Sequence, residues 1–254
     1  MLLIEQLPVA LIQISIVILM ASFVQSLTGF GFAIISVPIL VQLLDPKVSV
    51  QISLLLGFVI SAAALGAGYQ KGIKLDLRMS LLLGSLVGIP IGGLVLKIID
   101  PMALRVLVSV AGIVFAFLFL RGFSIQVSHE TATFAIVGVI SGILNSTTSM
   151  GGVVVALFLA NMGFDNINLR LNMLVYLLLT NIVTISILAL TGVFTSSTLI
   201  LGLELIPALL VGLALGTWLF PRVSRGVFTK IVLAVVLVAG ISGLISVTFS
   251  YIIL

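Results

Sequence analysis

Five uncharged polar residues stand in succession near the middle of the chain, with apolar runs on both sides. They are Asn145, Ser146, Thr147, Thr148 and Ser149, and Met150, Gly151 and Gly152 follow them. In hydrocarbon an unpaired polar group costs several kcal/mol, so such a stretch lies at membrane depth only inside protein or beside a hydrated cavity. The stretch therefore predicts a polar cavity enclosed by apolar segments.

A second polar break ends the first apolar run, and its members are Gln25, Ser26, Thr28, Gly29 and Gly31. A helix that begins at such glycines directs its unpaired N–H groups and its positive dipole end at the polar residues, which favours an anion there. In the alternative interpretation the hydroxyls bond to their own helices and the glycines only allow close packing. The length of the central stretch favours the cavity, and we predict that both breaks form one substrate site.

Three residues near the start of later apolar runs are further candidates for the same site. Gln51 and Asn172 could line the cavity, or could join neighbouring helices by hydrogen bonds. Arg170 could pair with an anionic substrate, although a basic residue at a helix end is more often an anchor at the membrane interface.

Two titratable residues need separate weighing. Glu204 lies inside an apolar run, where ionisable residues are usually functional, so it is a candidate for carrying a coupled proton. If its helix begins later, Glu204 instead lies in a first turn, where the helix dipole favours a carboxylate. His129 stands beside Glu130 in a polar loop, and we interpret it as a solvated loop histidine.

The composition is that of a polytopic membrane protein of the cell (inner) membrane. Apolar residues make up 61% of the 254 residues and charged residues only 7%, against about a quarter charged in soluble domains. No cysteine and one histidine leave no disulfide and no metal cluster, so we expect no cofactor. The net charge of +4 comes from short loops and predicts membrane orientation, with no nucleic-acid partner. We also expect no removable signal peptide.

The apolar runs predict an all-α protein, because about twenty apolar residues cross ~30 Å of hydrocarbon as a helix. The expected full spans are residues 8–27, 48–68, 79–96, 102–120, 171–190, 198–220 and 227–254. The expected short arms beside the polar breaks are residues 32–44, 131–144 and 153–162. Depending on whether an arm pair is one bent span or a hairpin, the chain has eight to ten membrane segments.

The order of elements recurs and indicates two homologous halves. We expect a first repeat at residues 1–121, a linker at 122–130 and a second repeat at 131–254. Each repeat would hold a broken-helix hairpin followed by three transmembrane helices. An offset of 121 places Gly31 on Gly152, and further on an offset of 124 places Gly88 on Gly212.

The distribution of Lys and Arg favours inverted repeats. Ten segments divide the eleven basic residues eight to three between the two sides, whereas eight segments divide them seven to four, and the positive-inside rule prefers the stronger asymmetry. Each half then crosses an odd number of times, and both termini face away from the cytoplasm. The richer side holds Lys71, Lys74, Arg78, Arg121, Arg170, Arg222, Arg225 and Lys230, and the poorer side holds Lys47, Lys97 and Arg105.

Two half-chains that each break at a glycine-containing turn resemble the TauE/SafE sulfite exporter family, also called TSUP. The turns are Thr28 to Gly31 and Ser149 to Gly152, and the resemblance covers nearly the whole chain. It implies a transporter for sulfur-containing anions such as sulfite or organosulfonates, by secondary active export or uptake. The implied partners are a small anion, coupled protons or sodium, and the lipid bilayer.

Two other classes remain as alternatives. An intramembrane hydrolase would need a base, and the sequence offers only His129, no HExxH motif and no suitably spaced pair of acids. A membrane assembly factor would not need two polar breaks at matched places. The sequence therefore favours a transporter that is not an enzyme.

Overall fold

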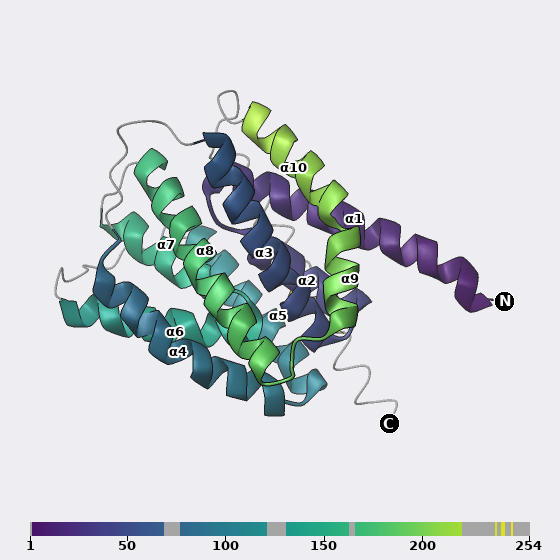
Figure 1. Ribbon diagram of the computed structural model, residues 1–254, viewed down its shortest axis with the longest axis horizontal. Helices are drawn as coiled ribbons and strands as arrows, with labels where there is room; N and C mark the ends of the chain where they lie inside the picture. Colours follow the sequence, from purple (N-terminus) through teal and green to yellow (C-terminus); the bar gives the residue numbers. More distant parts are fainter. Residues whose placement is uncertain are drawn as a thin grey trace.

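The computed structural model describes residues 2–68, 77–120, 131–162 and 166–219, together with residues 237, 240, 241 and 245. Within these parts the chain forms helices joined by turns, without a strand (Figure 1). The prediction of an all-α protein is confirmed. The helices are α1 (Leu2–Thr28), α2 (Phe32–Leu43), α3 (Pro46–Gly68), α4 (Met79–Ile98), α5 (Pro101–Leu120), α6 (Thr131–Thr148), α7 (Gly151–Asn161), α8 (Asn166–Leu190), α9 (Ser196–Glu204) and α10 (Ile206–Leu219).

Six of the described helices are long and apolar enough to cross a membrane, and α9 with α10 makes a bent pair that would be a seventh span. The helices α2 and α7 have 12 and 11 residues, so each rises less than about 20 Å. Each packs back against the long helix before it, α2 on α1 and α7 on α6. We call α1 with α2 hairpin 1 and α6 with α7 hairpin 2. The protein is a polytopic, multi-pass helical membrane protein.

Several sequence predictions fall outside the described residues. They concern the linker at 122–130 with His129, most of the last span at 227–254, and the loop residues Lys71, Lys74, Arg121, Arg222, Arg225 and Lys230. The orientation of the termini and the inversion of the halves depend on these residues, so both stay predictions.

Two helices begin with the same Asp-Pro capping arrangement. The Asp45 carboxylate accepts hydrogen bonds from the backbone N–H groups of Lys47 and Val48, and the Asp100 carboxylate does the same for the two residues after Pro101. Proline at the first helical position loses no hydrogen bond, since that N–H would have no partner within the helix. These caps fix the starts of α3 and α5.

In each half the third membrane-spanning helix packs on the first helix of the other half. The first-half helix α4 packs on α6, and the second-half helix α10 packs on α1, which Figure 1 shows at opposite sides of the central pair α3 and α8. A Cβ on Gly88 would meet the carbonyl oxygen of Val139, and a Cβ on Gly212 would meet that of Leu19. Gly212 stands 124 positions after Gly88, and Val139 stands 120 after Leu19. The contacts are therefore matched between halves, which supports an internal duplication.

Where α1 and α6 enter the turns the register is 120, and the starts of α2 and α7 differ by 119, so the predicted offset of 121 is wrong. The N–H of Gly29 donates to Gln25 O at 2.7 Å, and the N–H of Ser149 donates to Asn145 O at 2.8 Å. Gly29 and Ser149 both have positive φ, 83° and 63°. The first turn has two left-handed glycines, Gly29 and Gly31, whereas the second turn has one left-handed residue, Ser149, so glycine was not the right marker for the alignment.

Two expected element bounds are also wrong. Residues 131–144 are no short arm, because α6 continues through the polar residues to Thr148 and is a full-length helix. Residues 198–220 are not one straight span, because the chain bends by 46° between α9 and α10. Pro207 explains the bend: it lacks an N–H, and its ring clashes with the carbonyl of Leu203 in a continuous helix.

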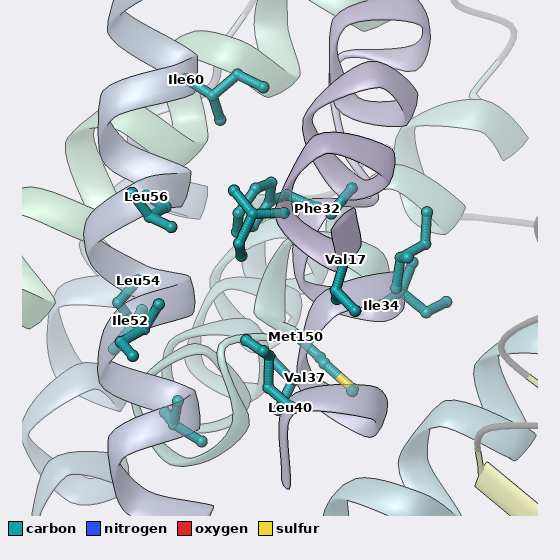
Figure 2. Packing of buried hydrophobic residues seen from close by; sticks show 14 of the residues in the cluster. Val17, Phe32, Ile34, Val37, Leu40, Ile52, Leu54, Leu56, Ile60 and Met150 are labelled. Carbon is teal, nitrogen blue, oxygen red and sulfur yellow. The ribbon is translucent and has the colours of Figure 1, made fainter. Parts of the chain in front are cut away.

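The main apolar core joins the two halves. Figure 2 shows buried side chains of α1, α2 and α3, among them Val37, Leu40 and Leu56, together with Met150 from the turn of hairpin 2. Met150 is completely buried in this cluster. The turn of the second half is thus held inside the core of the first.

Candidate functional site

A small cavity lies between the turns of the two hairpins. Its volume is about 20 Å³, enough for about one water molecule. Its walls come from α1, α2 and α3 of the first half, from α7 and α8 of the second, and from both turns. The lining residues are Gln25, Phe30, Gly31, Phe32, Ala33, Ile34, Ser53, Gly57, Ser149, Met150, Gly152, Val153, Leu177 and Asn181.

Two helix N-termini reach this cavity. The first residues of α2, from Phe32 to Ile34, line one side, and Gly152 and Val153 of α7 line another. Neither helix has a side-chain cap, because Gly31 and Met150 hold the N-cap positions. The first turn of a helix leaves its N–H groups without helical partners, and the dipole adds about half a positive charge at each end. Among the described lining residues none is charged, so the helix ends set the potential.

Hydroxyl groups join the second turn to the first half. The Ser149 hydroxyl donates to Ser53 Oγ on α3 at 3.0 Å, and Ser53 Oγ lies 3.2 Å from the Ser36 hydroxyl on α2. All three side chains are buried. The positive φ of Ser149 directs this hydroxyl across the boundary between halves.

Two matched pairs of polar side chains stand beside the turns. Gln25 Nε2 on α1 donates to Ser61 Oγ on α3 at 3.0 Å, and Asn145 Nδ2 on α6 donates to Asn181 Oδ1 on α8 at 3.0 Å. The partners are 36 positions apart in both pairs, which again gives a register of 120. The residues that reach the cavity differ, because Gln25 does so in the first half and Asn181 in the second.

Four of the sequence-predicted site residues line the cavity, namely Gln25, Gly31, Ser149 and Gly152. The others lie outside its lining. They are Ser26, Thr28, Gly29, Gln51, Asn145, Ser146, Thr147, Thr148, Gly151, Arg170 and Asn172.

Two of the four hydroxyls in the central polar stretch bond to their own helix, and one of them, Thr147 Oγ1, also lies 3.2 Å from Gly92 O on α4. Thr147 and Thr148 each donate to the carbonyl four residues earlier, at 2.8 Å. The Ser146 hydroxyl is buried and has no hydrogen-bond partner among the described residues. For Thr147 and Thr148 the geometry matches the structural alternative, in which the hydroxyl satisfies its own helix.

In the first break, too, some polar side chains bond to their own helix and one reaches the cavity. Ser26 donates to Phe23 O at 2.8 Å and lies where α10 crosses α1 at Gly216. Thr28 donates to Val24 O at 3.0 Å. Gln25 alone among the polar side chains of this break reaches the cavity.

Gln51 and Asn172 are buried away from the cavity. Gln51 Oε1 accepts a hydrogen bond from the Thr198 hydroxyl at 2.9 Å, which joins α3 to α9. Asn172 Nδ2 donates to Asn168 O at 2.8 Å within α8. Gln51 thus follows the interhelical alternative considered for it.

Gly29 and Arg170 are in direct contact, one at the turn of hairpin 1 and the other near the start of α8. A Cβ on Gly29 would lie 2.5 Å from the Arg170 carbonyl oxygen. The close approach and the φ of 83° both require glycine at this position. Gly151 is equally confined, since a Cβ there would meet Ser141 O and Asn145 Cβ.

Glu204 does not lie in the first turn of a helix, which was one of the two positions expected for it. It is the last residue of α9, at the bend before α10, and it is exposed. Where α9 and α10 form one bent span, Glu204 lies inside that span, at its bend.

Sequence reasoning missed Ser53, Gly57, Leu177, Asn181 and the apolar residues that complete the lining. Asn181 carried a usable signal, because it lies with Thr180 and Thr184 inside an apolar span. A buried amide in such a span needs a partner, and the polar turns were the available partners. The apolar lining residues carried no such signal.

A profile of the family described as Sulfite exporter TauE/SafE matches residues 14–243. The chain belongs to the TauE/SafE sulfite exporter family. No match was found among curated proteins or among solved structures. The match covers both hairpins and the cavity between them. The family consists of membrane transporters of sulfite or related anions, so this TauE/SafE protein is a transporter of that class.

Proposed function

We propose that this TauE/SafE protein carries a small monovalent oxyanion, sulfite in its singly protonated form or an organosulfonate, through the cavity between the two hairpins. The observation that carries the proposal is the meeting of two uncapped helix N-termini, one from each half, in a cavity whose described lining has no charged side chain. A helix N-terminus offers N–H donors and positive potential to an anion.

The charge of this site favours one negative charge on the substrate. Two helix ends supply about one positive charge together, since each contributes about half a unit. A divalent anion such as sulfate would keep about one uncompensated charge in a poorly hydrated site, which is costly. Sulfate is therefore the discriminating competitor for a sulfonate of similar shape.

The size of the cavity implies movement during transport. A volume of about 20 Å³ holds about one water molecule and is too small for an oxyanion with four or five heavy atoms. The short helices α2 and α7 each form part of the wall. We propose that these arms shift to admit the anion, as the arms of broken-helix transporters do.

The test is flux into proteoliposomes that contain the purified protein, with methanesulfonate, sulfite, sulfate, acetate and chloride compared. The expected result is saturable flux of methanesulfonate and sulfite, with little flux of sulfate. Empty liposomes are the control. Equal flux of sulfate and methanesulfonate would overturn the charge argument, and absence of any anion flux would overturn the transport proposal.

Energy coupling to protons or sodium belongs to the same proposal. Glu204, exposed at the bend between α9 and α10, is the candidate coupling residue. Replacing it by Gln should remove the dependence of flux on a pH gradient and leave downhill flux unchanged. An unchanged gradient dependence would exclude Glu204 from coupling.

A further inference from the structure

A chain of hydrogen bonds on α6 and α8 fixes the direction of two buried amides. The Thr184 hydroxyl donates to Thr180 O at 2.8 Å. Asn145 Nδ2 lies 3.3 Å from Thr184 Oγ1 and 3.0 Å from Asn181 Oδ1. These four residues are buried, and only Asn181 among them lines the cavity.

The hydroxyl proton of Thr184 fixes the orientation of both amides in this series of hydrogen bonds. A hydroxyl has one proton, and Thr184 uses it for Thr180 O, so Thr184 Oγ1 must accept from its other neighbour. Asn145 must therefore present its NH₂ group to Thr184 and, with it, to Asn181. Asn181 then presents its carbonyl oxygen to Asn145, and its NH₂ group faces the other way.

The NH₂ group of Asn181 faces α3 at the cavity. Its Nδ2 lies 3.0 Å from the place of a Cβ on Gly57, and both residues line the cavity. Asn181 is 3% exposed, and its Nδ2 donates no hydrogen bond within the described parts of the chain. Unlike Asn145 Oδ1, this nitrogen is not one of the fully buried side-chain atoms without a partner, so it keeps some accessible surface at the cavity.

The arrangement is not one that stability alone would favour. Asn145 Oδ1 is buried without a hydrogen-bond partner among the described residues. The hydrogen bonds that join Thr184, Asn145 and Asn181, which we call the relay, thus leave one acceptor unsatisfied on α6 and one donor at the cavity. Turning both amides around would again leave one unsatisfied atom on α6 and one at the cavity, so packing alone does not select an orientation. The Thr184 hydroxyl selects the orientation described here.

The first half has a hydroxyl in place of this amide. Ser61 stands at the position matched to Asn181, and its hydroxyl donates to Gly57 O at 2.7 Å. Ser61 can therefore only accept from Gln25 Nε2. That bond anchors Gln25 to α3, and the first half has no amide at the position matched to Asn181.

We propose that Asn181 determines specificity by donating a hydrogen bond from Nδ2 to an oxygen of the anion, and that Asn145 and Thr184 are positioning residues for it. The inference rests on the proposed anion transport and names a side chain that selects the substrate. A donor that cannot turn into an acceptor favours an oxyanion over a cation or a neutral acid of the same size.

The experiment measures KM and kcat for methanesulfonate flux in proteoliposomes for four variants. Asn181→Asp puts an acceptor and a negative charge in place of the donor, and its KM should rise roughly ten- to hundredfold. Thr184→Val removes the hydroxyl that fixes the orientation of the Asn145 and Asn181 amides. It should raise KM by about two- to fivefold with kcat retained. Thr184→Ser restores the hydroxyl and should restore KM.

The matched control is Thr180→Val. Thr180 is buried one turn away on the same helix, and its hydroxyl donates to Tyr176 O at 2.8 Å, with no hydrogen bond to either amide among the described residues. Its KM should equal that of the wild type. Asn181→Ser, which copies the first half, replaces Asn181→Asp if the latter does not fold, and its KM should also rise.

The outcomes separate the two proposals. A wild-type protein that moves no anion overturns the proposed function and this inference with it. A wild type that moves methanesulfonate while the Asn181 variants keep its KM overturns only the role of Asn181. Equal KM values for Thr184→Val and Thr180→Val overturn the relay.

Discussion

Hairpin 2 is hydrogen-bonded to its neighbours by hydroxyl groups at three positions, and the three matched positions around hairpin 1 hold apolar side chains. The Tyr176 hydroxyl on α8 lies 2.7 Å from Ser141 on α6 and 2.7 Å from Ser85 on α4. Ser141 in turn donates to Gly151 O, the first residue of α7, at 2.8 Å. The matched positions in the other half are occupied by Leu56, Ala21 and Leu209, all fully buried.

The difference separates what the duplication repeats from what it varies. Both halves keep the helix order, the turn geometry and the glycine contacts, since these depend on backbone approach. The polar side chains around the turns differ, because hydrogen bonds can be replaced by apolar packing of similar volume at little cost. Hairpin 2 therefore has a hydrogen-bonded frame, and α8 of the same half supplies the directed donor, whereas apolar packing holds hairpin 1 at the three matched positions.

The largest expected effect comes from making the first turn resemble the second. Gly29→Ser places a Cβ 2.5 Å from the Arg170 carbonyl oxygen at a left-handed position, which should destabilise the protein by about 2–5 kcal/mol. Size-exclusion chromatography in detergent should show loss of folded protein. The reciprocal change, Ser149→Gly, should leave the protein folded. A well-folded Gly29→Ser protein would show that the turns are interchangeable.

A smaller effect should follow from removing the hydroxyl by which α8 is bonded to hairpin 2. Tyr176→Phe breaks the bonds to Ser141 and Ser85 and should lower the free energy of unfolding by about 1–2 kcal/mol. The measurement is the midpoint of thermal unfolding in detergent. Ser186→Ala, which removes an exposed hydroxyl bonded within α8, should leave the midpoint unchanged. Equal midpoints for both variants would remove the energetic distinction between the hairpins.

The smallest effect should come from Ser146→Ala in α6. The Ser146 hydroxyl is buried without a partner and does not line the cavity, so its removal should change stability by less than about 0.5 kcal/mol or increase it slightly. Anion flux should be unchanged. Ser149→Ala is the companion variant, because it loses the bond to Ser53 at the cavity and should weaken flux. Comparable losses in both would place Ser146 at the site.

The sequence was sufficient for much of the fold, because lengths of apolar runs determine helices in a membrane. It located the polar turns and the short arms at residues 32–44 and 153–162, which α2 and α7 match closely. It did not determine which face of α6 turns inward, so Ser146 and Thr147 were expected at the site beside Ser149. The inward face depends on the packing of α4 against α6, and one sequence does not show this partner.

Asn181 and the register of 120 needed the structure for the same reason. A buried amide is recognisable in an apolar span, but its partner is 36 positions away on another helix. The left-handed residue of the second turn is serine, which carries no glycine signal. Pro207 was visible in the sequence, and the bend that it causes between α9 and α10 was predictable from its missing N–H.

The most direct test of the central claim is protection of single cysteines by substrate, since the chain has no cysteine of its own. Phe30→Cys and Ser149→Cys place one thiol in each turn at the cavity, and Ser197→Cys places one at an exposed position as the control. Methanesulfonate should slow labelling by a small maleimide in both turns and leave the control unchanged. Protection of only one turn, or of neither, would contradict a site shared by the two halves.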